Sequence, residues 1–123
     1  MSKLDNLVIQ ECKIKLINKK KEVLNRLHEL ARDFNSLDKG RDEVDLSTAN
    51  LAENQYLSTN KQLREMILEI DAALFRIQSG HFGFCEETDE LIELPRLMSI
   101  PWTRLSIEGA EIRESLKSRY LRV

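Results

Sequence analysis

The chain has 123 residues, a charged fraction of 33% and a net charge of −2, which fits one soluble domain and argues against nucleic-acid binding through bulk positive charge. No apolar run approaches the roughly 20 residues that span a bilayer, and the charged N-terminal stretch is unlike a signal peptide. Its two cysteines, Cys12 and Cys85, lie too far apart in sequence to suggest a disulfide framework. A cytoplasmic protein is therefore expected, and secreted or membrane-bound classes are excluded.

The first element expected is a long helix from about residue 6 to residue 37. This stretch contains neither Gly nor Pro, and its apolar residues recur at heptad spacing. The seam consists of Leu16, Val23, Leu30 and Leu37, with Lys20, Leu27 and Phe34 between them. Such spacing is typical of one helix of a coiled coil, here with a single charged residue in the seam.

A second long helix is expected from about residue 46 to residue 78. It also lacks Gly and Pro and carries a heptad seam. The seam consists of Ala49, Tyr56, Leu63, Ile70 and Ile77, with Ala52, Thr59, Met66 and Ala73 between them. A helix of this length extends roughly 50 Å. Gly80 follows directly, in the place where a left-handed helix cap is favoured.

Turn-forming residues separate the two helices, and Gly40 lies among them. Asp45 or Ser47 can cap the second helix at its start. Two amphipathic helices joined by a short loop fold back on each other, so residues 1–79 are predicted to form an N-terminal segment and an antiparallel coiled-coil hairpin, with its tip at about residues 38–47.

The remaining residues, 80–123, are predicted to form a small globular module. Its first part is rich in turns and prolines and is typical of an irregular or β-ribbon segment. Helical spacing resumes at about residue 106, which predicts a C-terminal helix. The fold class expected is therefore mainly α, and the small module must pack on the base of the hairpin because it can bury little on its own.

No catalytic motif is present. The two histidines, His28 and His81, are not part of a recognisable nucleophile motif, and no Gly-rich loop precedes a helix. Cys85 could pair with His81, but a structural thiol is the more economical interpretation. The sequence gives no catalytic residue and predicts a protein that is not an enzyme.

Several short motifs resemble the DksA/TraR family of bacterial transcription factors. Residues 82–85 are Phe-Gly-Phe-Cys, and Arg96-Leu97, Pro101 and Leu105-Ser106 follow; the family has F-G-Y-C-x-x-C, then R-L, then P, then L-C-x-x-C. The family also has a coiled-coil hairpin with a D-x-x-D-x-A tip, which Asp42 and Asp45 match in its two acids. The resemblance covers about residues 10 to 109, and it implies the same hairpin architecture that the heptads predict.

The resemblance also identifies the family's four zinc-ligand positions, which are Cys85, Thr88, Ser106 and Gly109 here. A single thiolate cannot hold a structural zinc, which takes four Cys or His ligands. The expectation is a degenerate zinc ribbon with no structural zinc and no other cofactor, held by apolar packing. The apolar side chains expected in that core are Phe82, Phe84, Ile92, Leu94, Leu97, Trp102, Leu105 and Ile107.

By resemblance, the partner is bacterial RNA polymerase. The hairpin would enter its secondary channel and destabilise open promoter complexes, with Asp42, Asp45 and Ser47 at the tip, near the catalytic Mg²⁺, and Arg96 as an anchor to polymerase. Ser47 stands where the family prefers Ala. The positions that bind the alarmone guanosine tetraphosphate in responsive relatives correspond to Glu69, Ile100 and Ala110, and these suit an anion poorly. A weak or absent response to this alarmone of the stringent response is therefore expected.

Other interpretations stay open. Asp42 and Asp45 could serve only as helix caps, and Arg96 could form only a surface ion pair. A Gre-like factor would use an acidic-tipped hairpin to stimulate transcript cleavage by polymerase. A coiled-coil adaptor or chaperone would not meet polymerase at all. A hairpin that satisfies its own seam is expected to be a monomer, with no membrane contact and no sequence-specific DNA binding.

Overall fold

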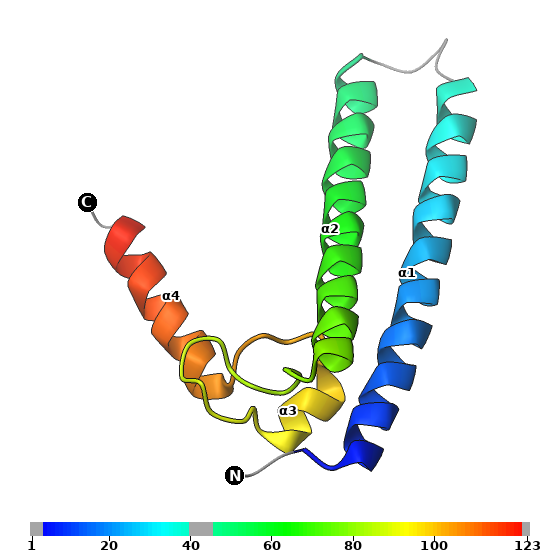
Figure 1. The fold of residues 1–123 in the computed structure, drawn as a ribbon. Helices are drawn as coiled ribbons and strands as arrows, with labels where there is room; N and C mark the ends of the chain where they lie inside the picture. The colour runs from blue at the N-terminus through cyan, green and yellow to red at the C-terminus, as the bar shows by residue number, and fades with distance from the viewer. Residues whose placement is uncertain (1–3, 40–45, 122–123) are drawn as a thin grey trace. The chain divides into compact units, whose positions relative to one another are not determined.

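A computed structural model describes residues 4–39 and 46–121 of the chain (Figure 1). This part of the chain contains four helices: α1 (Asn6–Lys39), α2 (Leu46–Ser79), α3 (Leu94–Ser99) and α4 (Ile107–Leu121). The mainly α fold class, with a coiled-coil hairpin and a C-terminal helix, is confirmed. The six-residue helix α3 was not predicted. Of the two forms expected for the first part of the small module, irregular or β-ribbon, the described residues show an irregular segment with one antiparallel bridge, between Phe84 and Leu91.

The contacts divide the chain into two units. Residues 18–68 form the hairpin unit, whereas residues 1–17 and 69–123 together form what we call the base unit. The base unit thus includes the start of α1 and the end of α2 as well as α3 and α4. The predicted boundary between residues 79 and 80 is a boundary between a hairpin and a module packed on its base, and it stays a prediction.

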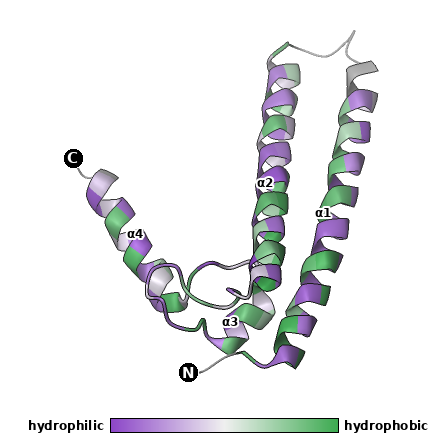
Figure 2. Cartoon of the chain, in the orientation of Figure 1, coloured by the Kyte–Doolittle hydropathy of each residue, from purple (hydrophilic) through white to green (hydrophobic). Residues whose placement is uncertain are grey.

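The hairpin unit is built on the predicted heptad seams. α1 and α2 run antiparallel (Figure 1), and hydrophobic and hydrophilic residues alternate along both helices (Figure 2). Val23 is buried in this unit, and the rings of Phe34 and Tyr56 stack with centroids 4.2 Å apart. A groove of about 260 Å³ lies beside this stack and is lined by Leu30, Asp33, Phe34, Ala52, Gln55, Tyr56 and Thr59.

The base unit contains most of the buried apolar side chains. These are Cys12, Leu16, Ile70, Ala73, Phe82, Cys85, Ile92 and Leu97. The start of α1 packs on α3: the Cys12 thiol lies 3.9 Å from the Leu97 carbonyl oxygen, and the Lys15 ammonium donates to the Met98 carbonyl at 3.0 Å. A cation at the C-terminal end of a helix is favourable because the last carbonyls there lack helical partners.

The expected replacement core is only partly correct. Phe82, Ile92 and Leu97 are buried, whereas Trp102 and Leu105 are half-buried. The prediction was wrong for three residues: Phe84, Leu94 and Ile107 are 41%, 48% and 51% exposed.

The local backbone bears on these exposures. Phe84 follows the turn at Gly83 (φ +95°), where it forms the bridge to Leu91 and is exposed between the buried Gly83 and Cys85. Ile107 begins α4 two residues before the buried Gly109, so the two residues lie on opposite faces of that helix. Leu94 is the first residue of α3, and its exposure is not set by the helix face, because the buried Leu97 follows it by three residues.

Two glycines have positive φ for distinct reasons. Gly80, at φ +81°, ends α2, and its amide donates to the Ile77 carbonyl while the His81 amide donates to Arg76. This pair of bonds is a Schellman cap, as the position of Gly80 predicted. Gly83, at φ +95°, leaves no room for a Cβ atom, which would collide with the side chain of Leu4.

Candidate functional site

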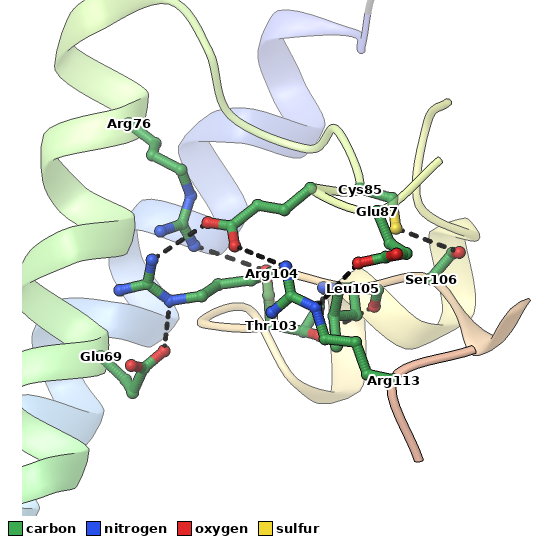
Figure 3. Close-up of polar contacts among 10 residues, drawn as sticks. Glu69, Arg76, Cys85, Glu87, Thr103, Arg104, Leu105, Ser106 and Arg113 are labelled. Atoms are coloured by element: carbon green, nitrogen blue, oxygen red, sulfur yellow. Dashed lines mark hydrogen bonds and ion pairs between the residues drawn. The ribbon is translucent and has the colours of Figure 1, made fainter. Parts of the chain in front are cut away.

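The four predicted zinc-ligand positions come together around one sulfur atom. The Ser106 hydroxyl donates to Cys85 Sγ at 3.4 Å (Figure 3). The same hydroxyl oxygen accepts from the Gly109 amide at 3.0 Å. A Cβ atom on Gly109 would collide with Cys85 Sγ. Thr88 also forms hydrogen bonds to the Cys85 thiol. The chain therefore retains the convergence that a metal site requires, although the side chains differ.

The backbone of this site is well ordered by local hydrogen bonds. The Cys85 and Asp89 amides donate to the carbonyls of Glu90 and Cys85 at 2.8 and 2.9 Å, closing a tight turn. The Ile92 amide donates to Gly83 at 2.8 Å and joins the two sides of the turn. This turn, residues 85–90, which we call the Cys85 turn, presents Cys85 and Thr88 toward the start of α4.

These side chains do not fit a structural zinc ion. Such a site takes four Cys or His ligands in a tetrahedron, whereas this cluster offers one thiol, two hydroxyl groups and a glycine that has no donor at all. Across residues 4–39 and 46–121, no group of three or more His, Cys, Asp or Glu side chains is arranged to hold a metal.

The pKa of Cys85 is lowered to about 6. Burial raises the pKa, but the hydrogen bonds from the side chain and backbone of Ser106, and then of Thr88, outweigh it and favour the thiolate. Burial is also the main reason that the pKa of the Cys12 thiol is raised. The two buried thiols therefore differ in chemistry, and only Cys85 titrates near neutral pH.

This lowered pKa predicts a pH-dependent stability. A thiolate that is favoured in the folded state contributes stability above the ordinary pKa of 9.0, and that stability is lost as the pH falls through about 6. Urea unfolding between about pH 6 and pH 8 should show stability rising with pH, by up to about 1.4 kcal/mol per pH unit. Cys85→Ser should remove most of this slope while both histidines remain. An unchanged slope in Cys85→Ser would contradict the assignment.

Asp89 lies in the left-handed region at φ +60°, a conformation that costs energy for residues with a Cβ atom. Asp89→Gly should therefore raise the free energy of unfolding by about 0.5–1 kcal/mol, whereas Asp89→Ala, which lacks a polar side chain to offset the strain, should lower it. Urea unfolding of the two variants and the natural chain tests whether the free energy of unfolding falls in the order Gly, Asp, Ala at position 89. An Ala variant as stable as the Gly variant would contradict the prediction.

An arginine–carboxylate network adjoins the Cys85 turn (Figure 3). Arg104 donates through Nε to Glu69 at 2.9 Å and through Nη1 to Glu86 at 3.0 Å. Arg113 on α4 donates to Glu87 at 3.0 Å and to Glu86 at 3.3 Å. Heptad spacing gave no signal for this network, since it joins residues up to 35 positions apart.

The predicted polymerase anchor, Arg96, has a contact within the base unit. Its Nε atom donates to the Leu105 carbonyl at 2.8 Å, and the Thr103 hydroxyl donates to the same oxygen at 2.9 Å. Arg96 therefore helps to hold the segment before α4. A role as anchor stays a prediction.

The structure describes only some of the residues of the predicted tip. Asp42 and Asp45 lie outside the described residues. Ser47 is exposed in the first turn of α2, which begins at Leu46, so Ser47 does not hold the position before the helix.

The three positions that correspond to the alarmone site of responsive relatives all lie in the base unit. The Glu69 carboxylate is bound by Arg104. Ile100 and Ala110 are half-buried and carry no donor on their side chains. The three side chains at these positions thus offer an anion no positive charge of their own, although the guanidinium of Arg104 lies beside Glu69.

Comparisons with known proteins agree with this architecture. Residues 80–115 match the family model of the prokaryotic dksA/traR C4-type zinc finger. The chain is 33% identical over 103 residues to the RNA polymerase-binding transcription factor DksA of Caulobacter vibrioides, covering 83% of this chain and 72% of that protein. It is 31% identical over 118 residues to an uncharacterised protein of Aquifex aeolicus, covering 93% and 81%.

A solved structure gives the same result. Transcription factor DksA2 from Pseudomonas aeruginosa matches with a TM-score of 0.84 and 27% identity over 93% of this chain and 88% of that one. The chain is thus a hairpin protein of the type found among bacterial transcription factors. It belongs to the DksA/TraR family. In the described part of the chain, no helix is long and apolar enough to cross a membrane.

Proposed function

We propose that this chain is a cytoplasmic, non-enzymatic transcription regulator that binds RNA polymerase directly and inserts its hairpin tip into the secondary channel, where it destabilises open promoter complexes. The observation that carries the proposal is the likeness to DksA2, because it extends over 93% of the chain and includes both the hairpin and the base unit. The Caulobacter relative is itself named for polymerase binding.

The mechanism follows from the tip acids. Asp42 and Asp45 carry carboxylates, which are the ligands that hard cations such as Mg²⁺ prefer. A tip that interacts more strongly with one polymerase–promoter state than with another shifts the populations of those states. Short-lived open complexes should therefore be lost first. Ser47 adds a hydroxyl group beside these acids.

We also propose that this regulator acts as a monomer, needs no zinc and responds weakly or not at all to guanosine tetraphosphate. One thiol among four converging positions supports the absence of zinc. The carboxylate of Glu69, already bound by Arg104, supports the weak alarmone response.

The test is the lifetime of open complexes at a ribosomal RNA promoter, measured with purified polymerase and Mg²⁺ and with a zinc-selective chelator present. The proposal predicts direct binding and a shortened lifetime that chelator does not change. Shortening of backtracked RNA instead would favour a Gre-like factor. A chain that fails to bind polymerase would favour the adaptor interpretation.

A further inference from the structure

The arginine–carboxylate network joins three segments of the base unit that are distant in sequence. Arg104 connects Glu69 of α2 to Glu86 of the Cys85 turn. Arg113 connects α4 to Glu86 and Glu87 of the same turn. The backbone adds to this connection, because the Glu86 amide donates to the Arg104 carbonyl at 2.9 Å.

The network spans the same segments as the four converging ligand positions. Glu86 and Glu87 lie between Cys85 and Thr88 in the turn. Arg104 lies two residues before Ser106, and Arg113 lies one helical turn after Gly109. A C4 metal site cross-links the turn to the start of α4 through its ligands. The network cross-links the same turn to the same helix, and it adds α2.

This network differs from an isolated surface ion pair, which contributes little to stability. Glu86 accepts from two arginines, and Arg104 donates to two carboxylates. The side chains are 27% to 45% exposed, so they are partly withdrawn from water. Ion pairs that share members in this way order one another, because each charge holds its neighbour in place.

The titration behaviour of Glu86 agrees with this view. Partial burial raises its pKa, but the hydrogen bonds and charges of Arg104 and then Arg113 outweigh that effect and lower the pKa. Arg76 adds a further contact, since its Nη2 atom donates to the carbonyl oxygens of Trp102 and Thr103, the two residues before Arg104, at 3.4 Å each. Its charge also faces that of Arg104, and this repulsion adds to burial in lowering the pKa of Arg76.

We propose that the network of Glu69, Glu86, Glu87, Arg104 and Arg113 cross-links the base unit in place of a structural metal. The proposal rests on the proposed independence from zinc and goes beyond it, because it names the groups that replace the metal. Apolar packing alone is then insufficient to order the Cys85 turn, in line with the exposure of Phe84, Leu94 and Ile107.

Hydrogen exchange of single amides tests this proposal in the full chain with chelator present. The Asp89 and Ile92 amides report on the turn, since they bind the Cys85 and Gly83 carbonyls. Glu86→Gln removes the charge at nearly constant size, and Arg104→Gln removes the charge and shortens the side chain. Each variant should speed the exchange of these amides about tenfold. The double variant should be only slightly faster than either single variant, because the two residues act through one network.

Glu65→Gln is the matched control. Glu65 pairs with Lys61 at 4.0 Å in the hairpin unit, and both side chains are largely exposed, so this variant should leave the turn amides unchanged. Salt of about 1 M should also speed exchange at the turn in the natural chain and less so in Glu86→Gln.

Any of three results for the exchange rates of the turn amides would overturn the proposal. The first is a change below about twofold in both single variants, and the second is a double variant whose fold-change equals the product of the two single fold-changes. The third is a fold-change in Glu65→Gln as large as that in Glu86→Gln. Binding to polymerase is measured separately. If the two substitutions act non-additively on exchange but the protein does not bind polymerase, only the proposed function is refuted. If the protein binds polymerase but the two substitutions act independently, only the network proposal is refuted.

Discussion

Replacing Asp42 and Asp45 with Asn is expected to abolish the shortening of open-complex lifetime while binding to polymerase changes little. The carboxylates lie at the predicted tip, and their charge supplies the interaction that distinguishes one polymerase state from another. Loss of charge-assisted contacts should weaken the effect at least about tenfold. The measurement is the decay of open complexes at saturating concentrations of each variant.

Two comparisons make this result specific. Circular dichroism melts should be nearly unchanged, which separates loss of function from loss of the hairpin. Ser47→Ala restores the residue that the family prefers at the third tip position and should retain or strengthen the effect. An Asp42→Asn, Asp45→Asn variant that remains fully active would show that these residues serve as helix caps and no more.

Leu97→Ala is expected to be the most damaging single change to the base unit. The side chain is fully buried, and its Cδ1 atom lies 3.6 Å from the place where a Cβ of Gly83 would be. Truncation leaves a cavity between α3 and the Cys85 turn, which should lower the free energy of unfolding by about 2–5 kcal/mol. Urea unfolding followed by circular dichroism gives this value.

Leu94→Ala is the control on the same helix. Leu94 is 48% exposed, so its truncation removes little buried surface and should cost well under about 1 kcal/mol. The sequence analysis predicted that both Leu94 and Leu97 lie in the core of the small module. Equal losses for the two variants would contradict the orientation of α3.

The long helices could be predicted because their determinants are local. The seams of α1 and α2 repeat every seven residues without an intervening Gly or Pro, and Gly80 follows the last helical residue with the left-handed conformation that a cap requires. The motif around Cys85 also sufficed to identify the family, which the comparisons then confirmed.

The base unit could be predicted only in outline because its determinants are distant in sequence. α3 has six residues and begins beside Pro95, which is too short for a periodic signal. Phe84 is as apolar as Phe82, yet Phe82 is buried and Phe84, after the turn at Gly83, is 41% exposed, a difference that residue type alone does not predict. The pairing of Arg104 with Glu69 and Glu86 depends on how three segments meet, and no spacing rule encodes that.

The proposed function depends most on the position of the tip in the polymerase complex. Replacing the active-site Mg²⁺ of polymerase with Fe²⁺ generates hydroxyl radicals that cut only nearby chains. A tip in the secondary channel should give cuts in this protein confined to about residues 38–48. Binding to polymerase without cuts in this segment would place the tip elsewhere and contradict the central claim.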